Sequence, residues 1–434
     1  MSFTKTISGW GGYPKVKSEI IIPKDLKDFA KNLNKPLIPR GMGRSYGDSA
    51  NFRTVLQTQY LDHLLEFDKD NGVLTCESGI IIKNILNLIV PNGWFIPVSP
   101  GTSYATLGGA IASDVHGKNH HQSGTFGDHV QSIKMMLGSG EIIETSPNIL
   151  PDLFYATCGG MGLTGIILSA TIKLLPIKSS KIFQTEIKSK SLEETCSIFN
   201  EKENSTYSVG WLDCMASGRD QGKSIIILGE HEKSGNLNFD VKKKLNIPVN
   251  VPSFILNKYF ITVFNKLFYA KTKNQSNKKI DLFNYFYPLD KIHNWNRLYG
   301  KKGFIQYQFV IPSDNAVKNI RFILDKISEF GLSSFLSVLK KFGNQNNNLL
   351  SFPMSGYTLA LDFKLGGNLF ESINKLDEIV ADMGGRIYLT KDSLMSEKIF
   401  KKTYKRWEEF EIVREKYGAI NKFCSDQSKR LGLK

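Results

Sequence analysis

The segment Pro39–Ala50, PRGMGRSYGDSA, combines glycines and arginines in a way that suits an anionic ligand. Gly41, Gly43 and Gly47 permit positive φ angles and a close approach of the backbone to a ligand. Successive backbone N–H groups of such a loop form a concave site for an anion, and the two arginines of the segment add positive charge. The spacing differs from G-x-G-x-x-G, and no G-K-[ST] follows, which weakens nicotinamide-type Rossmann binding and P-loop chemistry. We therefore expect this segment to hold a diphosphate.

A second glycine-rich segment, Ser99–Val130, contains residues suited to lie under a flat ring. Gly108-Gly109 would let the backbone lie against a ligand. The small residues Ala110, Ala112 and Ser113 could pack closely beneath the ring. Alone, each of the two segments is a weak signal, because a glycine-rich stretch is usually a surface turn.

Three histidines cluster in the same segment, at His116, His120 and His121, with Lys118 between them. Two nearby aspartates make a metal site thinkable. No helical His-x-x-x-His pair with a third acidic ligand is evident, so we expect no metal. A polar lining around a flavin or an anionic substrate is the better interpretation.

The elements that position these segments begin with short strands and glycine turns. Val73–Gly79 alternates apolar and polar residues, as a half-buried strand does, and Ile81–Val90 has helical spacing. Residues Ile133–Ile143 predict a hairpin with a Gly-Ser-Gly turn. Gly165–Pro176 predicts a further strand that ends at a proline.

The middle of the chain changes character and repeats a strand–helix–strand pattern. Ser191-Leu-Glu-Glu194 predicts a capping box before a helix. The first unit has a strand, a helix and a strand at 304–311, 313–330 and 332–339, and the second at 357–365, 369–383 and 386–389. Two such units in series predict an antiparallel sheet with helices on one face. Ala270–Lys279 and Lys341–Asn348 are polar and predict long surface loops.

Composition excludes several classes of protein. The chain has 434 residues, 41% of them hydrophobic, which favours more than one domain. It has no apolar run of membrane-spanning length, and its first residues lack a signal core. The five cysteines are dispersed without a C-x-x-C pair, as expected in a reducing cytoplasm. The formal net charge of +15 attracts polyanions but selects none, and no nucleic-acid-binding motif is present.

Taken in order, three segments resemble the vanillyl-alcohol oxidase/p-cresol methylhydroxylase flavoprotein superfamily: PRGMGRSYGDSA, PGTSYATLGGAIASDVHGKNHH and ATCGGMGLTGII. Further segments are similar to a branch that oxidises a lipid-linked sugar phosphate: SGWGG, GFIQYQFVIP, LSFPMSGY, GGRIYLTKDS and SDQSKRLGLK. The resemblance covers nearly the whole chain. It implies an α+β fold with an FAD-binding domain at 1–177, an antiparallel-sheet substrate domain at 178–385, and a C-terminal part at 386–434 that returns to the FAD domain.

The resemblance also implies which residues hold the cofactor. These are Pro39, Arg40, Gly41, Met42, Gly43, Arg44, Ser45, Tyr46, Gly47, Asp48, Gly101, Thr106, Leu107, Gly108, Gly109, Ser113, Asp114, Val115, His116, Ile166, Ile167 and Tyr388. Many members of the superfamily attach the flavin covalently to a histidine in the first loop. Arg44 stands at that position here, so we expect a noncovalent FAD.

Oxidation of a secondary alcohol needs a hydride acceptor and a proton acceptor. The resemblance implies Lys391, His116 and Tyr46 as catalytic residues, with Lys391 essential for turnover and His116 second. It implies Gln308, Lys340, Lys118 and Tyr388 as substrate-binding residues. The identity of the base stays open between Lys391 and His116.

The implied activity is FAD-dependent oxidation of the 2′-hydroxyl of a polyprenyl-phosphate-linked ribose, in cell-wall arabinan biosynthesis. A short-chain NAD(P)H-dependent reductase would then reduce the ketone, for net epimerisation to arabinose. The alternative is an FAD enzyme for another sugar, polyol or aldonolactone. We expect a cytoplasmic protein, peripheral at the inner membrane surface, with no nucleic-acid partner. The basic segment Ala270–Lys279 and the aromatic segment Tyr259–Phe268 could contact lipid, although core packing explains the second equally well.

Overall fold

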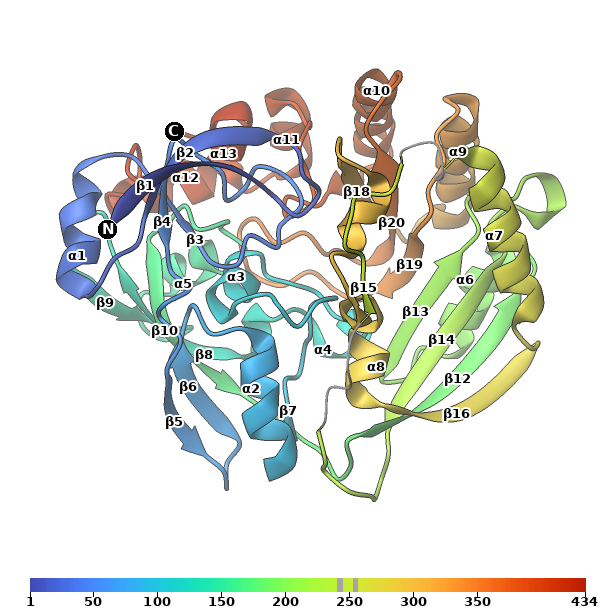
Figure 1. The fold of residues 1–434 in the computed structure, drawn as a ribbon, viewed down its shortest axis with the longest axis horizontal. Helices are drawn as coiled ribbons and strands as arrows, with labels where there is room; N and C mark the ends of the chain where they lie inside the picture. The colour runs from blue at the N-terminus through green and yellow to red at the C-terminus, as the bar shows by residue number, and fades with distance from the viewer. Residues whose placement is uncertain (240–244, 253–256) are drawn as a thin grey trace.

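The computed structural model describes residues 1–239, 245–252 and 257–434. Two blocks of β-structure lie side by side in Figure 1, with the N-terminal strands at the left and the strands of the middle of the chain at the right. Helices and strands both contribute, as the predicted α+β class requires.

The left block contains two sheets. The first has the order β1-β2-β4-β3, from strands β1 (Ser2–Ser8), β2 (Lys15–Ile21), β4 (Thr54–Gln57) and β3 (Ile38–Arg40), and β4 is parallel to both of its neighbours. The second is antiparallel, with the order β5-β6-β10-β8-β9, from β5 (Leu64–Asp68), β6 (Val73–Glu77), β10 (Ile166–Lys173), β8 (Val130–Met136) and β9 (Ile142–Thr145). It contains the predicted strand at 73–79 and the predicted hairpin at 133–143. The predicted helix after that strand is α2 (Ile82–Ile89).

The right block is an eight-stranded sheet of order β16-β12-β14-β13-β19-β20-β18-β21, in which neighbouring strands are antiparallel. Its strands are β16 (Gln275–Asp281), β12 (Lys181–Ser189), β14 (Ser224–His231), β13 (Tyr207–Leu212), β19 (Ser337–Phe342), β20 (Gly356–Lys364), β18 (Phe304–Pro312) and β21 (Arg386–Ile387). Helices α6 (Leu192–Glu201), α9 (Ala316–Glu329) and α10 (Leu369–Asp382) pack against it and against one another. This confirms the antiparallel sheet expected from the two strand–helix–strand units.

Burial explains why strand β18, which lies beside the short edge strand β21, has a continuous apolar sequence with two glutamines. From Phe304 to Ile311 its residues are buried on both faces. Helices α9 and α10 pack against the strand, and Tyr46 and His116 of the first block contact Phe304 and Gln308. In a strand that is half exposed, the outward residues would be polar throughout.

Three local predictions need correction. Residues 270–279 are not a long loop: they form the end of α7 (Lys258–Lys271) and most of the edge strand β16, and only a short connection separates them. The capping box before α6 is half formed, since Ser191 accepts from the Glu194 N–H but Glu194 accepts from the N–H of Lys190 rather than that of Ser191. The loop predicted at 341–348 begins two residues later, after β19.

The remaining helices and short strands complete the chain. They are α1 (Leu26–Lys31), β7 (Trp94–Phe95), α3 (Leu107–Ala112), α4 (His120–Ser123), α5 (Pro151–Thr157), β11 (Leu175–Pro176), β15 (Leu245–Asn246), α8 (Leu282–Phe286), β17 (Ile292–His293), α11 (Glu397–Thr403), α12 (Trp407–Lys416) and α13 (Asp426–Arg430). Within the described ranges, no helix combines the length and the apolar character needed to cross a bilayer.

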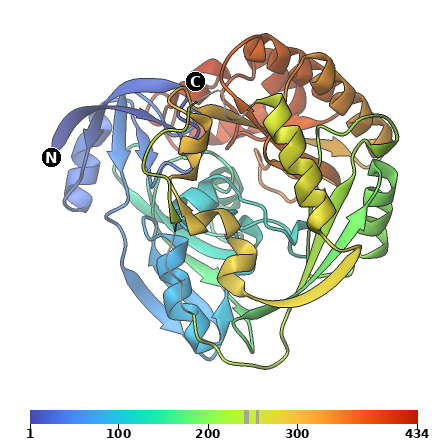
Figure 2. The same ribbon diagram turned by 45° about the vertical axis from the view of Figure 1, so that its right-hand side comes forward.

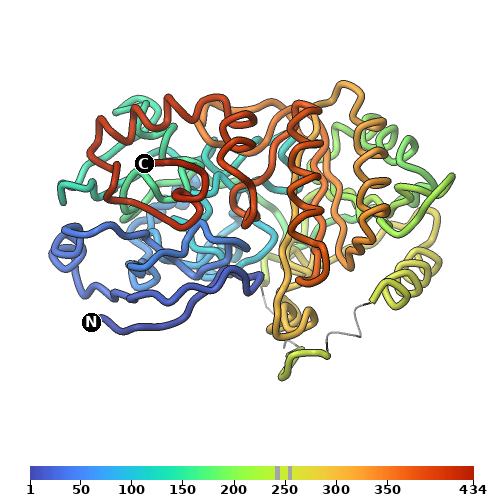
Figure 3. Tube along the Cα trace, turned by 90° about the horizontal axis from the view of Figure 1, so that it is seen from above, coloured from blue at the N-terminus to red at the C-terminus, as the bar shows by residue number. Residues whose placement is uncertain are grey.

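The C-terminal helices lie beside the N-terminal strands (Figures 1 and 3). Arg414 of α12 is fully buried and donates to the carbonyl oxygens of Leu163, Phe423 and Lys434. The N–H of Cys424 donates to the carbonyl of Leu37 at 2.9 Å. These contacts support the proposed return of residues 386–434 to the first domain, although Arg386–Ile387 pairs with β18 of the eight-stranded sheet. The exact boundaries stay a prediction.

Candidate active site

The first glycine loop is packed tightly between two other segments of the chain. A Cβ on Gly41 would lie 2.4 Å from Oγ1 of Thr106, and one on Gly47 would lie 1.8 Å from the carbonyl oxygen of Asp392. The N–H of Tyr46 donates to the carbonyl of Thr390 at 2.9 Å. Glycine is therefore required at these two positions for the contact itself. The loop, the Thr106 region and the segment after β21 therefore lie in direct contact.

The two arginines of this loop have different roles. Arg40 donates to the carbonyls of Ala50 and Ser8 and to Oδ1 of Asn51. Its guanidinium therefore links the start of the loop to the end of the loop and to β1. Burial lowers the pKa of Arg40 to about 10. Arg44 instead lies over the rings of Trp10 and Tyr104, at 4.3 and 5.0 Å from their centroids. Nε of Arg44 is buried and has no partner among the described residues. Arg44 is thus the arginine whose charge remains available to an anion.

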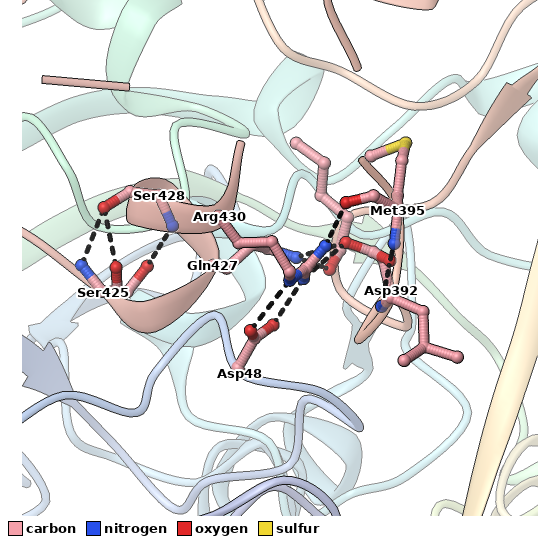
Figure 4. Close-up of polar contacts among 9 residues, drawn as sticks. Asp48, Asp392, Met395, Ser425, Gln427, Ser428 and Arg430 are labelled. Carbon is pink, nitrogen blue, oxygen red and sulfur yellow. Dashed lines mark hydrogen bonds and ion pairs between the residues drawn. The ribbon is translucent and has the colours of Figure 1, made fainter. Parts of the chain in front are cut away.

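Asp48 holds the end of the loop by an ion pair (Figure 4). Nη2 of Arg430 is 2.7 Å from Oδ1 of Asp48 and 2.9 Å from Oδ2 of Asp392. Gln427 donates to the carbonyl of Leu389 at 2.7 Å. Burial raises the pKa of Asp48, and Arg430 opposes that shift. The Asp48 carboxylate therefore fixes the loop to α13, so any contact of Asp48 with a cofactor would involve its backbone.

The second glycine segment also carries one side chain that is fully engaged by protein. The buried Asp114 carboxylate accepts from the N–H of Gly127, Nδ2 of Asn348 and Oγ of Ser351, at 2.6–2.9 Å. It connects this segment to the loop that follows β19. Asn346 donates to the same carboxylate at 3.0 Å.

The other residues expected at the cofactor divide into two groups. Gly109 and Gly101 are exposed, and Ser113 is partly exposed and accepts from the Tyr388 hydroxyl at 3.2 Å. Leu107, Val115, Ile166 and Ile167 are buried in the apolar cores. Ile166 and Ile167 are consecutive in β10, so their side chains point to opposite faces and cannot both contact one ligand.

His116 lies where the two blocks meet. Gln308 of β18 donates from Nε2 to Nε2 of His116 at 3.0 Å, which places the ring proton on Nδ1. The imidazole packs against Phe342 and Tyr388, with ring centroids at 4.7 and 5.3 Å. Burial, followed by the nearby Lys340, lowers the pKa of His116 well below its usual value. His116 is therefore neutral at physiological pH.

The other two histidines do not converge with His116 on a metal. His120 accepts at Nδ1 from the N–H of Gly343, at 3.1 Å. Nε2 of His121 is 2.9 Å from the carbonyl of Ser205. Each of the three rings thus has a separate partner in the protein.

Three lysines gather around the His116–Gln308 pair. Burial lowers the pKa of Lys391 to about 7, that of Lys118 to about 7 and that of Lys340 to about 8. Lys340 also lowers the pKa of the other two, which places the charge of Lys340 near each of them. Each lysine is surrounded by protein yet keeps some accessible surface. None of them forms an ion pair with a described residue.

Lys391 is positioned by aromatic and acidic neighbours. Its Nζ lies 3.8 Å from the centroid of the Tyr46 ring. Asp362 of β20 raises the pKa of Lys391, against the larger lowering by burial. Burial raises the pKa of Asp362 itself to about 6. Lys118, in contrast, places its Nζ 4.1 Å from the Tyr285 ring centroid and donates to the Tyr285 carbonyl.

Asp362 and its partners were missed by sequence reasoning. Tyr299 donates to Asp362 Oδ2 at 3.0 Å, and Gln306 donates to Oδ1 at 2.6 Å. Gln306 and Asp362 are directly opposite in the β18–β20 register. The polar residues at 306 and 308 in an otherwise apolar strand were a usable signal. Their partner could not be found without knowing the strand pairing.

The arrangement fits a flavin dinucleotide. The unpartnered Arg44 Nε and the glycine-lined backbone of Pro39–Asp48 suit the diphosphate, and the exposed Gly109 allows close approach to a ring system. Lys391, Tyr46, His116 and Gln308 would then surround the reacting centre.

Comparison with known proteins decides the family. Residues 24–146 match the FAD binding domain model. The chain is 35% identical to decaprenylphosphoryl-β-D-ribose oxidase of Mycolicibacterium smegmatis over 451 aligned positions, covering 99% of this chain and 98% of that protein. The chain belongs to this FAD-dependent oxidase family.

Membership of the oxidase family makes this protein an FAD-dependent oxidoreductase. More distant similarity covers about a third of each chain. D-lactate dehydrogenase of Archaeoglobus fulgidus is 30% identical over 34% of this chain and 35% of its own. L-gulonolactone oxidase of Scyliorhinus torazame is 25% identical over 35% of each chain. The names of these relatives show that their substrates differ.

Proposed function

We propose that the protein oxidises the 2′-hydroxyl of a polyprenyl-phosphate-linked ribose to a ketone. The observation that carries this proposal is the group of three lysines, Lys118, Lys340 and Lys391, beside Gln308 and His116. Unpaired lysines held inside a protein are costly unless a ligand supplies the counter-charge. A phosphate on the substrate supplies it, whereas a neutral polyol or lactone does not. The similarity over the whole length of a decaprenylphosphoryl ribose oxidase agrees with this choice.

The residues divide the work as follows. Lys340 and Lys118 bind the phosphate, and Gln308 orients the sugar hydroxyls. Lys391 accepts the proton of the reacting hydroxyl. FAD, when bound, supplies the acceptor for the hydride of the carbinol carbon. Tyr46 holds the amine of Lys391 above its ring, and Tyr388 bonds to the backbone of the second glycine segment through Ser113.

The environment favours Lys391 over His116 as the base. A general base works best when its pKa lies near the working pH. The pKa of Lys391 is lowered to about 7, whereas that of His116 is lowered well below its usual value. His116 also accepts a hydrogen bond at Nε2, which occupies the lone pair that a base would use. We assign His116 to orienting Gln308 and lining the site.

A second candidate function is oxidation of a different sugar, polyol or aldonolactone, which the similarity to an L-gulonolactone oxidase favours. Anaerobic bleaching of bound flavin separates the two. We expect bleaching by a prenylphosphoryl ribose and none by its 2-deoxyribose counterpart, L-gulonolactone or D-lactate. Bleaching by the lactone, with none by the ribosyl phosphate, would establish the second function instead.

The product of the proposed reaction is a 2-keto sugar that remains attached to its lipid phosphate. We propose that a short-chain NAD(P)H-dependent reductase consumes it and produces the arabinose form. Both enzymes would then work at the cytoplasmic surface of the membrane that carries the lipid. A coupled assay with such a reductase tests this step, since ribose consumed and arabinose formed should be equal.

A further inference from the structure

Helix α7 (Lys258–Lys271) presents large apolar side chains to solvent. Tyr259 is 84% exposed, Val263 56% and Leu267 66%. These residues are spaced by four, so they form one line along the helix. Phe260 and Phe264, at 44% and 36%, widen the line into a stripe. In the body of a globular protein such a stripe would face the core, so its exposure requires an explanation.

The helix is held in this orientation by its other face. Ile261 and Asn265 are buried, and Nδ2 of Asn265 donates to Asp213 at 2.8 Å. Phe268 packs on Trp211 with ring centroids 4.9 Å apart. The Tyr269 hydroxyl donates to the carbonyl of Ser189 at 3.0 Å. The exposed stripe is therefore fixed outward by contacts along the helix. In Figure 2 no other element lies in front of α7.

The chain segment that carries the stripe contains only basic charged residues. From Asn257 to Ile280 the sequence contains no aspartate or glutamate. Lys258, Lys266, Lys271 and Lys273 form no ion pair with the described residues. By contrast, the edge strand β16 has its lysines neutralised, since Lys278 and Lys279 pair with Glu186 and Glu232. An apolar stripe flanked by unpaired lysines matches an anionic bilayer surface in both apolar character and charge.

The position of α7 relates the stripe to the active site. Trp211, Val338, Ala360 and Gln308 are successive partners across β13, β19, β20 and β18. Residues directly opposite in a sheet point to the same side. Trp211 contacts α7, and Gln308 contacts His116. Neighbouring strands are roughly 4.8 Å apart, so Trp211, where α7 contacts the sheet, lies three strands or about 14 Å from Gln308.

We propose that α7 docks the protein onto an anionic lipid bilayer, with Tyr259, Val263 and Leu267 inserted among the lipid chains and the flanking lysines on the headgroups. This inference rests on the proposed function, because it would bring a lipid-linked substrate to the site side of the sheet. Of the two lipid contacts expected from the sequence, it selects the aromatic segment Tyr259–Phe268 and names the three side chains that enter the bilayer. Each lysine at such a surface raises binding by roughly fivefold.

Vesicle sedimentation of the FAD-loaded protein tests the proposal. The probe is vesicles of phosphatidylcholine with an equal amount of phosphatidylglycerol, against vesicles of phosphatidylcholine alone. We expect binding to the anionic vesicles, weakened by salt. The triple variant Tyr259→Ser/Val263→Ser/Leu267→Ser should bind at least tenfold more weakly. The triple variant Ile149→Ser/Phe322→Ser/Ile412→Ser, which removes exposed apolar residues of other elements, should bind as the wild type does.

Turnover separates this proposal from the proposed function. The α7 variant should oxidise a short-chain, water-soluble prenylphosphoryl ribose at the wild-type rate and lose activity on the long-chain substrate in vesicles. Vesicle binding without oxidation of either substrate leaves the docking surface standing and refutes the proposed function. Equal sedimentation of wild type and α7 variant overturns the proposal. So does conversion of a wild-type dimer to a monomer by the α7 substitutions, since the stripe would then join two copies of the chain.

Discussion

Replacement of Lys391 is the most direct perturbation of the proposed chemistry. Its amine lies over the Tyr46 ring, and burial, opposed by Asp362, lowers its pKa to about 7. At pH 7 about half of such amines are neutral, against roughly 0.03% for a lysine of unperturbed pKa. The surroundings therefore increase the concentration of free base more than a thousandfold, by the same relation. Lys391→Ala removes this base, and we expect flavin reduction to slow by about 10²–10⁴-fold.

The assay is the single-turnover rate of anaerobic flavin bleaching at saturating substrate, measured from pH 5 to pH 9. In the wild type the rate should rise with pH and reach half its maximum near pH 7, because only the neutral amine accepts a proton. Lys391→Arg should be as slow as Lys391→Ala, since a guanidinium stays protonated. Added methylamine should restore part of the rate in Lys391→Ala, in proportion to its free-base fraction.

Lys341, which follows Lys340 in β19, supplies the control. Lys341 forms an ion pair with Glu203, so Lys341→Ala should leave the bleaching rate unchanged. A near-normal rate in Lys391→Ala that still contains FAD would refute the role of Lys391. A near-normal rate in Lys391→Arg would show that Lys391 acts as a cation and not as a base.

Three further predictions concern the residues around Lys391 and the cofactor. Asp362→Asn should shift the acidic limb of the bleaching profile to lower pH, because the carboxylate raises the pKa of Lys391; a shift to higher pH contradicts the assignment. Arg430→Met should lower the free energy of unfolding by about 3–5 kcal/mol, measured in urea, since it leaves Asp48 and Asp392 as unpaired buried carboxylates. A loss below about 1 kcal/mol, typical of an exposed pair, would show that the ion pairs of Arg430 contribute little to stability. Acid precipitation should release all the FAD, because Arg44 replaces a flavin-linking histidine; a yellow pellet would disprove noncovalent binding.

Much of the fold could be predicted because hydrophobic periodicity, and the glycines or prolines that end helices and strands, are properties of short stretches of sequence. The strand–helix–strand units from residue 304 to residue 389 are an example: α9 and α10 begin and end within a few residues of their predicted bounds. The prediction of a loop at 270–279 was wrong because it, too, relied on local signals. This segment has few apolar residues of its own, and it becomes a strand only because β12 supplies an edge to pair with.

The sequence by itself predicted an anionic cofactor at the two glycine segments and, through their resemblance, that this cofactor is FAD, which the family match confirms. It could do so because the conformational freedom of glycine and the positive charge of arginine are properties of short segments. Only the tertiary structure decided which of those residues are engaged by the protein itself. It engaged Arg40, Asp48 and Asp114 in hydrogen bonds and left Arg44 Nε without a hydrogen-bond partner among the described residues, because partners distant in sequence meet only when the chain folds. It also brought Lys118, Lys340 and Lys391 together from three separate segments, and their lowered pKa values arise mainly from the burial that folding imposes.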